Sequence, residues 1–372
     1  KALFVSDKLY TKVSKERVAK SNIVIRTKNL SVLAQNVTEQ GSMAEPKPED
    51  LAAIIYTSGT TSSPKGVMHT HQSLCSQLHL LQVLFPIHRD DVWLSVLPLS
   101  HTYECSLGML FPMSRGSNVT YLDRPPTVSV LLPALKQVRP TIMLIVPLII
   151  EKIFKHQVLA TFNAKAVTRA LYGWGPTRRV LHLLAGKKLD KVFGGRIRFL
   201  GIGGAKLDPE VERFLLKAKF PYAIGYGLTE TSPLLGYAMH GWRAVGSFGY
   251  PVYNVKLKLH NVNPETGEGE VVAKGPNVML GYYKDPVRTK SVFTEDGWFR
   301  TSDIAVQDEK GRFYIKGRNS NMILGPSGEN IYPEEIENVI NNVEGVSESI
   351  VVERDGRLVA LVAPQENFIQ WD

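Results

Sequence analysis

The most informative stretch of this chain is rich in serine and threonine and ends with a lysine and a glycine: Tyr56-Thr57-Ser58-Gly59-Thr60-Thr61-Ser62-Ser63-Pro64-Lys65-Gly66. It directly follows the apolar run 51–55. Hydroxyl and backbone N–H groups in such a run can hold anionic oxygens from several sides, and Lys65 adds a positive charge. It is not a Walker A loop, because that motif needs Gly-Lys followed by Ser or Thr. The stretch predicts a phosphate-binding loop, with an ordinary Ser/Thr-rich surface loop as the alternative.

Composition restricts the class of protein. The 372 residues are 44% hydrophobic and 21% charged, which is enough for a large core and more than one domain. The longest apolar run, 142–150, is interrupted by Pro147 and is too short to span a bilayer. Only Cys75 and Cys105 are present, which fits a reducing compartment and argues against a disulfide framework. We therefore expect a cytoplasmic protein and, because the chain begins at Lys1 rather than Met, a fragment without its true N-terminal part.

The net charge of +9 is concentrated in residues 155–198, where Asp190 is the only acidic residue. Interleaved leucines and aromatic residues give this segment an amphipathic pattern, which favours a peripheral contact with a membrane surface. A solvated basic face is an equally compatible alternative. No aromatic platform or fold signature of a nucleic-acid binder accompanies the charge, so we expect no nucleic-acid partner.

Strand-like runs alternate with helical patterns, which predicts an α/β protein with mostly buried sheets flanked by helices. Segments 142–146 and 197–202 are predicted strands, each followed by a helix that begins at Pro147 or after Asp208. The spacing of Leu74, Leu78 and Leu81 predicts a helix after the first loop. We expect three strand-loop-helix units whose loops bind ligand at the carboxyl ends of the strands.

The pattern changes twice towards the C-terminus. Short strands over 255–260, 269–273 and 313–316 predict a small β subdomain. After Gly317-Arg318, a helix that begins at Pro333 and a hairpin formed by 350–352 and 358–362 predict a small α+β module, which ends soon after its second strand. We expect this module to be truncated.

Three further motifs carry side chains suited to a nucleotide. Gly203-Gly204-Ala205 lacks bulk, so a flat ring can lie against its backbone, although most such glycines only form a turn. The segment 225–231 places Tyr226, able to stack on a base, next to Glu230, able to ligate Mg²⁺; a polar loop is the alternative. Asp303 can accept two ribose hydroxyls, or can act only as a cap or turn residue.

Taken in order, these motifs resemble the adenylate-forming superfamily of acyl-CoA synthetases, luciferases and peptide-synthetase adenylation domains. The resemblance runs from about residue 50 to the end and includes Tyr226-Gly227-Leu228-Thr229-Glu230, an interdomain Gly317-Arg318 and the glycine-rich segment 325–337. Residues 97–104, Leu-Pro-Leu-Ser-His-Thr-Tyr-Glu, look like the corresponding segment of long-chain fatty acid–CoA ligases, and a ligase for another carboxylate explains them nearly as well. His101, read without the family, is more often a structural histidine.

The resemblance implies a large N-terminal AMP-binding domain over 1–317, with its small β subdomain, a hinge over 318–321, and an incomplete mobile α+β C-terminal domain over 322–372. It implies that a carboxylic acid, in particular a long-chain fatty acid, reacts with ATP and Mg²⁺ to an acyl-adenylate and then with coenzyme A. The implied ATP and AMP contacts are Thr57, Ser58, Gly59, Thr60, Thr61, Lys65, Gly203, Gly204, Ala205, Tyr226, Gly227, Thr229, Asp303 and Arg318. The implied catalytic residues are Thr229, Glu230, Lys65 and Arg318, with Glu230 also the magnesium ligand. His101 and Tyr103 would border the carboxylate, and Gly328 would line the path of the thiol.

Several positions depart from the family pattern. Ser62 and Ser302 replace glycines, and we expect phosphate binding to be retained and Ser302 to have little consequence. Ser320 and Asn321 stand where a lysine and an acid or Asn are usual in the hinge, and no counterpart of the family's C-terminal catalytic lysine precedes Asp372. The alternatives are therefore a nucleotide-binding homologue without full turnover, or a ligase for a different carboxylate or a carrier-protein thiol. A homo-oligomer is also compatible with the sequence.

Overall fold

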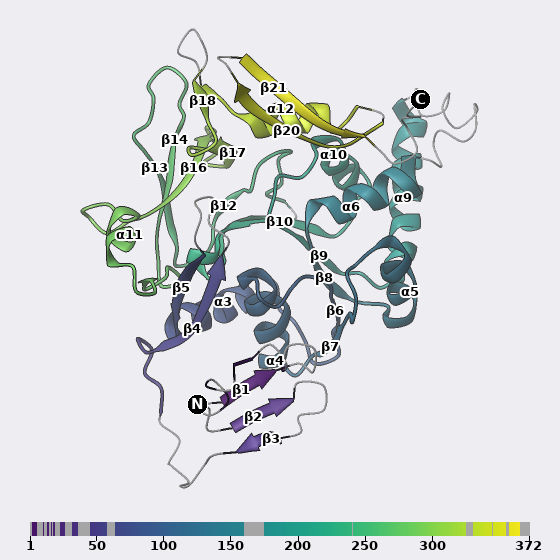
Figure 1. The fold of residues 1–372 in the computed structure, drawn as a ribbon. Helices are drawn as coiled ribbons and strands as arrows, with labels where there is room; N and C mark the ends of the chain where they lie inside the picture. The colour runs from purple at the N-terminus through teal and green to yellow at the C-terminus, as the bar shows by residue number, and fades with distance from the viewer. Residues whose placement is uncertain are drawn as a thin grey trace, which may run out of the picture. The chain divides into compact units, whose positions relative to one another are not determined.

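Two compact units, 1–47 and 48–372, make up the chain in the computed structural model of Figure 1. The structure describes residues 2–5, 10, 13, 14, 16, 18, 23–26, 32–35, 45–57, 64–159, 175–239, 241–324, 330–343, 345–354 and 357–364. In the first unit, β1 (Ala2–Val5) pairs parallel with β2 (Ile23–Arg26), which pairs antiparallel with β3 (Val32–Gln35).

A seven-stranded sheet forms the centre of the second unit, in the order β12-β11-β10-β9-β8-β6-β7. Its strands from β7 to β10 run parallel, and β11 and β12 are antiparallel additions. Strand β8 is buried along its whole length, as expected for a parallel strand covered on both faces. The α/β class is thus confirmed. The strands are β6 (Val92–Ser95), β7 (Asn118–Tyr121), β8 (Ile142–Ile145), β9 (Phe199–Ile202), β10 (Tyr222–Gly227), β11 (Leu234–Ala238) and β12 (Tyr250–Pro251).

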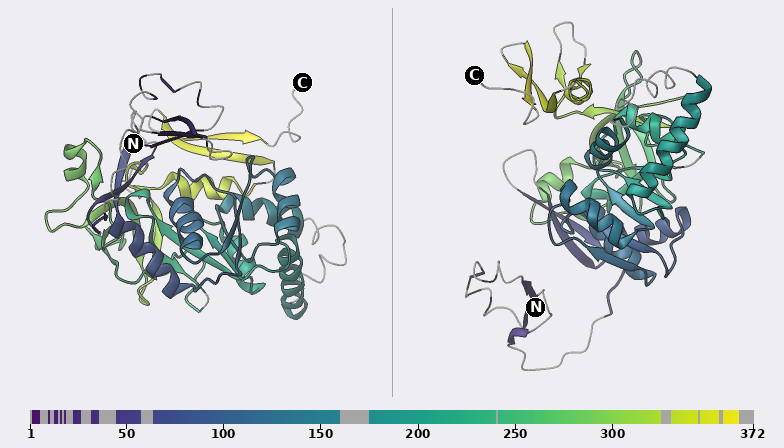
Figure 2. Two further views of the ribbon diagram at one scale, coloured as in Figure 1. Left: turned by 90° about the horizontal axis from the view of Figure 1, so that it is seen from below. Right: turned by 90° about the vertical axis from the view of Figure 1, so that its right-hand side faces the viewer.

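Helices pack around this sheet (Figures 1 and 2). They are α3 (His71–Leu84), α4 (Phe111–Ser114), α5 (Val128–Val138), α6 (Pro147–Ile153), α9 (Gly175–Val192) and α10 (Pro209–Lys217), together with π-helical segments at Tyr103–Leu110 and Phe154–Leu159. The predicted helices after β8 and β9 are confirmed, and Asp208 caps α10 by accepting from the Glu210 N–H at 2.6 Å. Among the described helices, none is both long and apolar enough to cross a membrane.

The predicted strand-loop-helix unit at the first loop is wrong. Strand β4 (Leu51–Thr57) pairs antiparallel with β5 (Lys65–Thr70), and β5 also pairs with β15 (Gly281–Tyr282). The strand β5 therefore intervenes before α3, and the loop 58–63 joins two strands of a separate sheet. Because Thr57 and Lys65 are register partners, the pairing of β4 with β5 holds the two ends of the loop opposite each other.

The predicted β subdomain and the predicted helix and hairpin of the C-terminal module are confirmed. The four-stranded sheet has the order β13-β14-β16-β17, with the strands β13 (Lys256–His260), β14 (Gly269–Lys274), β16 (Phe299–Gln307) and β17 (Phe313–Arg318). In the chain, β15 and helix α11 (Pro286–Ser291) come between β14 and β16, but neither belongs to this sheet. The module contains β18 (Ile323–Leu324), β19 (Asn330–Ile331), α12 (Pro333–Ile340), β20 (Val346–Arg354) and β21 (Arg357–Pro364). The turn predicted at 355–356 lies outside the described residues. The domain boundaries and the hinge at 318–321 stay predictions.

Ser302 has a consequence that the sequence did not indicate. It lies in β16 with φ of +63°, in the left-handed region that disfavours a residue with a Cβ, where the pairing of β14 with β16 is irregular. Ser302→Gly is expected to relieve about 1–2 kcal/mol of backbone strain, partly offset by ~0.5–1 kcal/mol of added freedom in the unfolded chain. Urea unfolding should show the variant to be more stable.

The matched control for this prediction is Ser347→Gly, at an exposed position of β20 outside the positive-φ region. It should lower the free energy of unfolding, because it only adds freedom to the unfolded chain. Equal destabilisation by both substitutions would contradict the assigned strain at Ser302.

Candidate functional site

A cavity of about 640 Å³ opens where the central sheet meets the β subdomain and the C-terminal module. Six predicted nucleotide contacts line it: Gly204, Ala205, Tyr226, Gly227, Asp303 and Arg318. They come from the loop after β9, from β10, and from β16 and β17, so residues up to 114 positions apart in the chain meet here. Its volume is within the usual range for small-molecule sites, and it lies at the carboxyl ends of parallel strands. We call it the nucleotide cavity.

Asp303 is the most constrained carboxylate of the nucleotide cavity. It is 5% exposed and lies within β16, opposite Arg318, rather than after a strand. Its Oδ2 accepts a hydrogen bond from the Tyr226 hydroxyl at 2.7 Å, and its Oδ1 accepts from Arg318 Nε at 3.2 Å. Burial raises the pKa of Asp303, while the Tyr226 hydrogen bond and the Arg318 charge oppose the rise. Both oxygens are thus oriented by polar partners, as recognition of a vicinal diol requires.

The Tyr226 ring is held from one side. Phe248 stacks on it with ring centroids 4.4 Å apart and planes 25° apart, and Phe313 stacks in turn on Phe248 at 5.5 Å. A base that stacks on Tyr226 must therefore use the face opposite Phe248. The aromatic column makes the position of the Tyr226 ring independent of any ligand.

Two glycines are required here by the backbone. A Cβ on Gly227 would overlap the carbonyl oxygen of Pro233, where β10 turns into β11, so no other residue fits without rearrangement. Gly204 has φ of +89° and ends the turn after β9. On the other side of that turn, a Cβ on Gly203 would lie 3.4 Å from the Tyr103 ring, so the ring lies about one methyl group away from the glycine backbone.

Tyr282, a residue that sequence reasoning missed, connects two of the residues predicted to act at the phosphates. The Tyr282 hydroxyl donates to Glu230 Oε1 at 2.8 Å, and Lys65 Nζ lies 5.3 Å from the centroid of the Tyr282 ring. Tyr282 reaches this position because β15 pairs with β5, the strand that begins at Lys65. The structure therefore brings a predicted cation and a predicted carboxylate together around one buried phenol.

Glu230 is the candidate magnesium ligand. No group of three or more His, Cys, Asp or Glu side chains that could enclose a metal occurs in the described part of the chain. A single half-buried carboxylate near Lys65 instead suits Mg²⁺, which binds through one or two carboxylates and takes its remaining ligands from water and phosphate oxygens. The donor set fits an ion that arrives together with a triphosphate.

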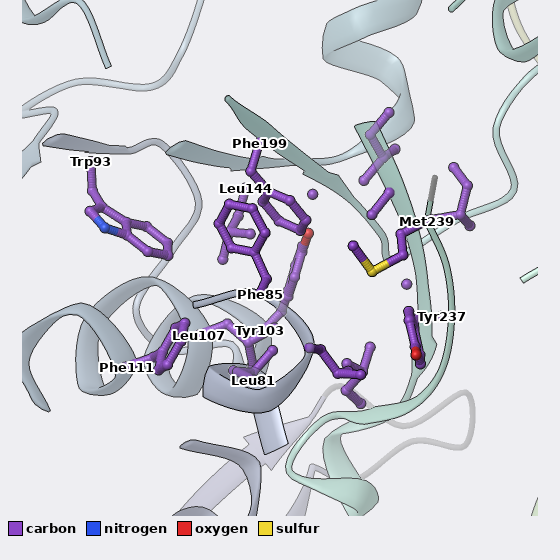
Figure 3. A pocket seen from close by; sticks show the side chains of 17 residues that line it. Leu81, Phe85, Trp93, Tyr103, Leu107, Phe111, Leu144, Phe199, Tyr237 and Met239 are labelled. Atoms are coloured by element: carbon purple, nitrogen blue, oxygen red, sulfur yellow. The ribbon is translucent and has the colours of Figure 1, made fainter. Parts of the chain in front are cut away.

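A second cavity, about 60 Å³ and apolar, adjoins the first. Figure 3 shows the side chains that line it. Both cavities share Ile224 and Gly225 in their walls. Tyr103 lines the apolar cavity and lies close to the glycine turn that borders the first cavity. In Figure 3, Phe85 and Phe199 lie near the centre, with Trp93 and Phe111 on one side and Tyr237 and Met239 on the other. We call this second space the acyl cavity.

The remaining predicted site residues are not all brought together. His101 is exposed and is not among the residues that line either cavity, so its assignment to the carboxylate pocket stays a prediction. Thr229 begins the short turn Thr229–Thr231 beside Glu230. Ser58, Gly59, Thr60, Thr61 and Gly328 lie outside the described residues. Their roles also stay predictions.

Glu104 was missed as well and is a buried acid behind the acyl cavity. It lies in the π-helical segment Tyr103–Leu110, is 1% exposed, and has no cation among the groups that shift its pKa. Burial raises the pKa of Glu104 to about 7, and a Ser95 hydrogen bond only partly opposes the rise. Gly108 leaves room for the carboxyl, because a Cβ there would overlap it. π-Helical turns are often found at functional sites.

Comparison with known proteins agrees with this geometry. The family described as AMP-binding enzyme matches residues 1–283. The peroxisomal long chain acyl-CoA synthetase 6 of Arabidopsis thaliana is 33% identical over 87% of this chain and 49% of its own length, and the long-chain-fatty-acid–CoA ligase 1 of Cavia porcellus is 31% identical over 88% and 50%. The ATP-bound crystal structure of MatB from Rhodopseudomonas palustris has a TM-score of 0.75, 25% identity, and coverage of 99% of this chain and 69% of that one. The chain spans about half the length of the curated relatives it matches.

Proposed function

Because the chain belongs to the AMP-binding enzyme family, we propose that it contributes the adenylation site of an ATP-dependent carboxylic acid ligase. The observation that carries this proposal is the junction of the nucleotide cavity with the acyl cavity at Ile224 and Gly225. An acid whose chain occupies the acyl cavity has its carboxylate directed towards the nucleotide. This arrangement favours attack of a carboxylate oxygen on the α-phosphorus, with pyrophosphate as the leaving group and an acyl-adenylate as the product.

The residues would act by positioning and electrostatics, since carboxylate and triphosphate repel each other. Asp303 would hold the ribose hydroxyls and Tyr226 the adenine. Lys65, with the loop 58–63, would hold the β- and γ-phosphates, and Thr229 the α-phosphate. Mg²⁺ held by Glu230 would neutralise charge on the phosphate oxygens. No protein nucleophile is needed for this reaction.

The second half-reaction is transfer of the acyl group to a thiol, which we propose to be that of coenzyme A, with release of AMP. Arg318 ends β17 and contacts Asp303, the Asn319 N–H donates to the Ser302 carbonyl at 2.8 Å, and Asn321 Nδ2 donates to Glu334 Oε1 at 2.7 Å. Rotation of the C-terminal module about residues 318–321 would change these contacts, and Gly328 would then line the path of the thiol. A carrier-protein thiol remains the alternative acceptor.

We propose a long-chain fatty acid as the substrate. The acyl cavity is lined by leucines and aromatic rings. The two relatives named above are a long chain acyl-CoA synthetase and a long-chain-fatty-acid–CoA ligase. At about 60 Å³ the cavity holds only a few water-sized groups, each of which needs roughly 10–15 Å³ by the same measure. A long chain therefore requires Phe85 and Phe199, now stacked at 4.0 Å, to separate.

ATP–pyrophosphate exchange in the full-length protein, with saturated acids of four to eighteen carbons, tests the proposal. Exchange should rise with chain length until the chain fills the opened acyl cavity, and each added methylene should improve kcat/KM by up to about 4-fold, the equivalent of ~0.8 kcal/mol. Phe199→Ala should shift the preference towards longer acids, whereas Phe293→Ala, at a ring outside both cavities, should not. No exchange with any acid would refute the ligase and leave a nucleotide-binding protein.

We also propose a cytoplasmic location. Cys75 and Cys105 are both free in the structure, with Cys75 exposed, which is compatible with a reducing compartment. Imaging of the tagged full-length protein would test it.

A further inference from the structure

Helix α9 presents a continuous face of apolar and basic side chains to solvent. The residues of this face, which we call the α9 face, are Val180, Leu183, Leu184, Lys187, Lys188 and Lys191, all exposed. Their spacing of three and four places them in one stripe along the helix. Val180 and Leu184 are 56% and 57% exposed, so both keep most of their apolar surface in water.

The core does not account for these apolar residues. The opposite side of α9 is buried through Ala185 and Leu189, which belong to the main hydrophobic cluster of the second unit. A helix that only covers a core needs one apolar stripe, whereas α9 has a second one on its exposed side. Leu183 and Leu184 are therefore an addition that folding of this unit does not require. Figures 1 and 2 show α9 at the outside of the unit, so its outer face is not covered by another described element.

Charge indicates what would cover the α9 face. Its C-terminal half carries Lys187, Lys188 and Lys191, while Asp190, the only acid of α9, is half-buried at the edge of the stripe. Arg196, just after the helix, is exposed as well. Apolar side chains next to long cationic ones match the boundary of a lipid leaflet, where leucines enter the acyl region and lysine stems extend towards phosphates.

We propose that the α9 face docks on an anionic lipid surface. A polyanion such as RNA would satisfy the lysines but would leave Val180, Leu183 and Leu184 in water. A second copy of this chain would cover the leucines but would set the lysines of one copy against a basic partner. The lipid surface satisfies both halves of the α9 face. The inference does not depend on the proposed ligase activity.

Co-sedimentation of the purified full-length protein with phosphatidylcholine vesicles, with and without 30% phosphatidylserine, tests the proposal. Binding should require the anionic lipid and weaken with added salt. Lys187→Gln with Lys191→Gln should lower the partition constant about 25-fold, since each lysine near such a surface contributes roughly five-fold. Leu183→Ser with Leu184→Ser should also lower the partition constant on the anionic vesicles, because both leucines would otherwise enter the acyl region.

Matched controls are Lys256→Gln with Lys310→Gln, and Val262→Ser with Val287→Ser, all at exposed positions away from α9. They should bind vesicles like the unmodified protein, and thermal unfolding should confirm that every variant is folded. Equal loss in the control pairs, or vesicle binding unchanged by the α9 substitutions, would overturn the proposal. So would a dimer that only the leucine substitutions dissociate, or lysine-dependent binding of RNA without binding of vesicles.

Discussion

Replacing Glu230 by Gln is expected to lower the rate of ATP–pyrophosphate exchange by about 100-fold to 1,000-fold, the usual effect of removing one group that stabilises charge at a reacting phosphate. Glutamine keeps the shape of the side chain and can still accept from Tyr282, but it has no charge to offer a metal ion. Single-turnover measurements with saturating acid and a magnesium titration would show the loss as a lower rate and a weaker dependence on magnesium.

Tyr282→Phe is the control for this experiment. It removes the hydroxyl that donates to Glu230 but keeps the carboxylate and the ring beside Lys65. We expect a loss of about five-fold, the equivalent of one hydrogen bond of ~1 kcal/mol. If Glu230→Gln keeps half of the exchange rate, Glu230 is not the magnesium ligand. Equal large losses in both variants would instead indicate that the position of Glu230, rather than its charge, limits the reaction.

Glu104→Gln is expected to make the protein more stable at pH 8 and to remove one component of its pH dependence. The pKa of Glu104 is about 7 in the folded protein against an ordinary 4.5, so the folded state binds more protons between these values. The free energy of unfolding therefore falls as pH rises from 4.5 to 7. Above pH 7 the total decrease in the free energy of unfolding is about 3 kcal/mol, because each unit of pKa shift corresponds to about 1.36 kcal/mol.

Urea unfolding at pH 5 and pH 8 would measure this effect as a difference between the two proteins. At pH 8 the free energy of unfolding of the variant should exceed that of the unmodified protein by most of the roughly 3 kcal/mol. At pH 5 the difference should be small. Glu309→Gln, which changes an exposed carboxyl, is the control and should leave the difference between the two pH values unchanged. Parallel pH profiles for Glu104→Gln and the unmodified protein would contradict the assignment.

Local signals were sufficient for the elements that contain their own start or turn residues. Helix α10 begins where Asp208-Pro209 predicts, because the cap and the fixed proline φ are properties of adjacent residues. The same holds for α6 at Pro147 and α12 at Pro333. Long apolar strands such as β8 were found because burial on both faces leaves a continuous apolar run.

What the sequence did not reveal depends on pairing between distant segments. Tyr282 reaches Glu230 only because a two-residue strand pairs with β5, more than 200 positions earlier. The sequence predicts a strand-loop-helix unit where the structure has the hairpin of β4 and β5, because the six residues of β5 are too few to show a period of their own. The strain at Ser302 depends on a local irregularity of pairing with β14, which no pattern within β16 records.

The close approach of Gly227 to the Pro233 carbonyl has a consequence for how relatives of this protein should be compared. The contact belongs to the turn from β10 into β11, so it is needed whether or not a nucleotide ever binds. A descendant that lost catalysis would still be selected to keep this glycine, because losing it would cost the fold. Glu230 is under no such requirement, since no backbone group in the described part of the chain bonds to its carboxylate. Among homologues, retention of the glycine with loss of the glutamate would therefore mark the inactive branches of the family.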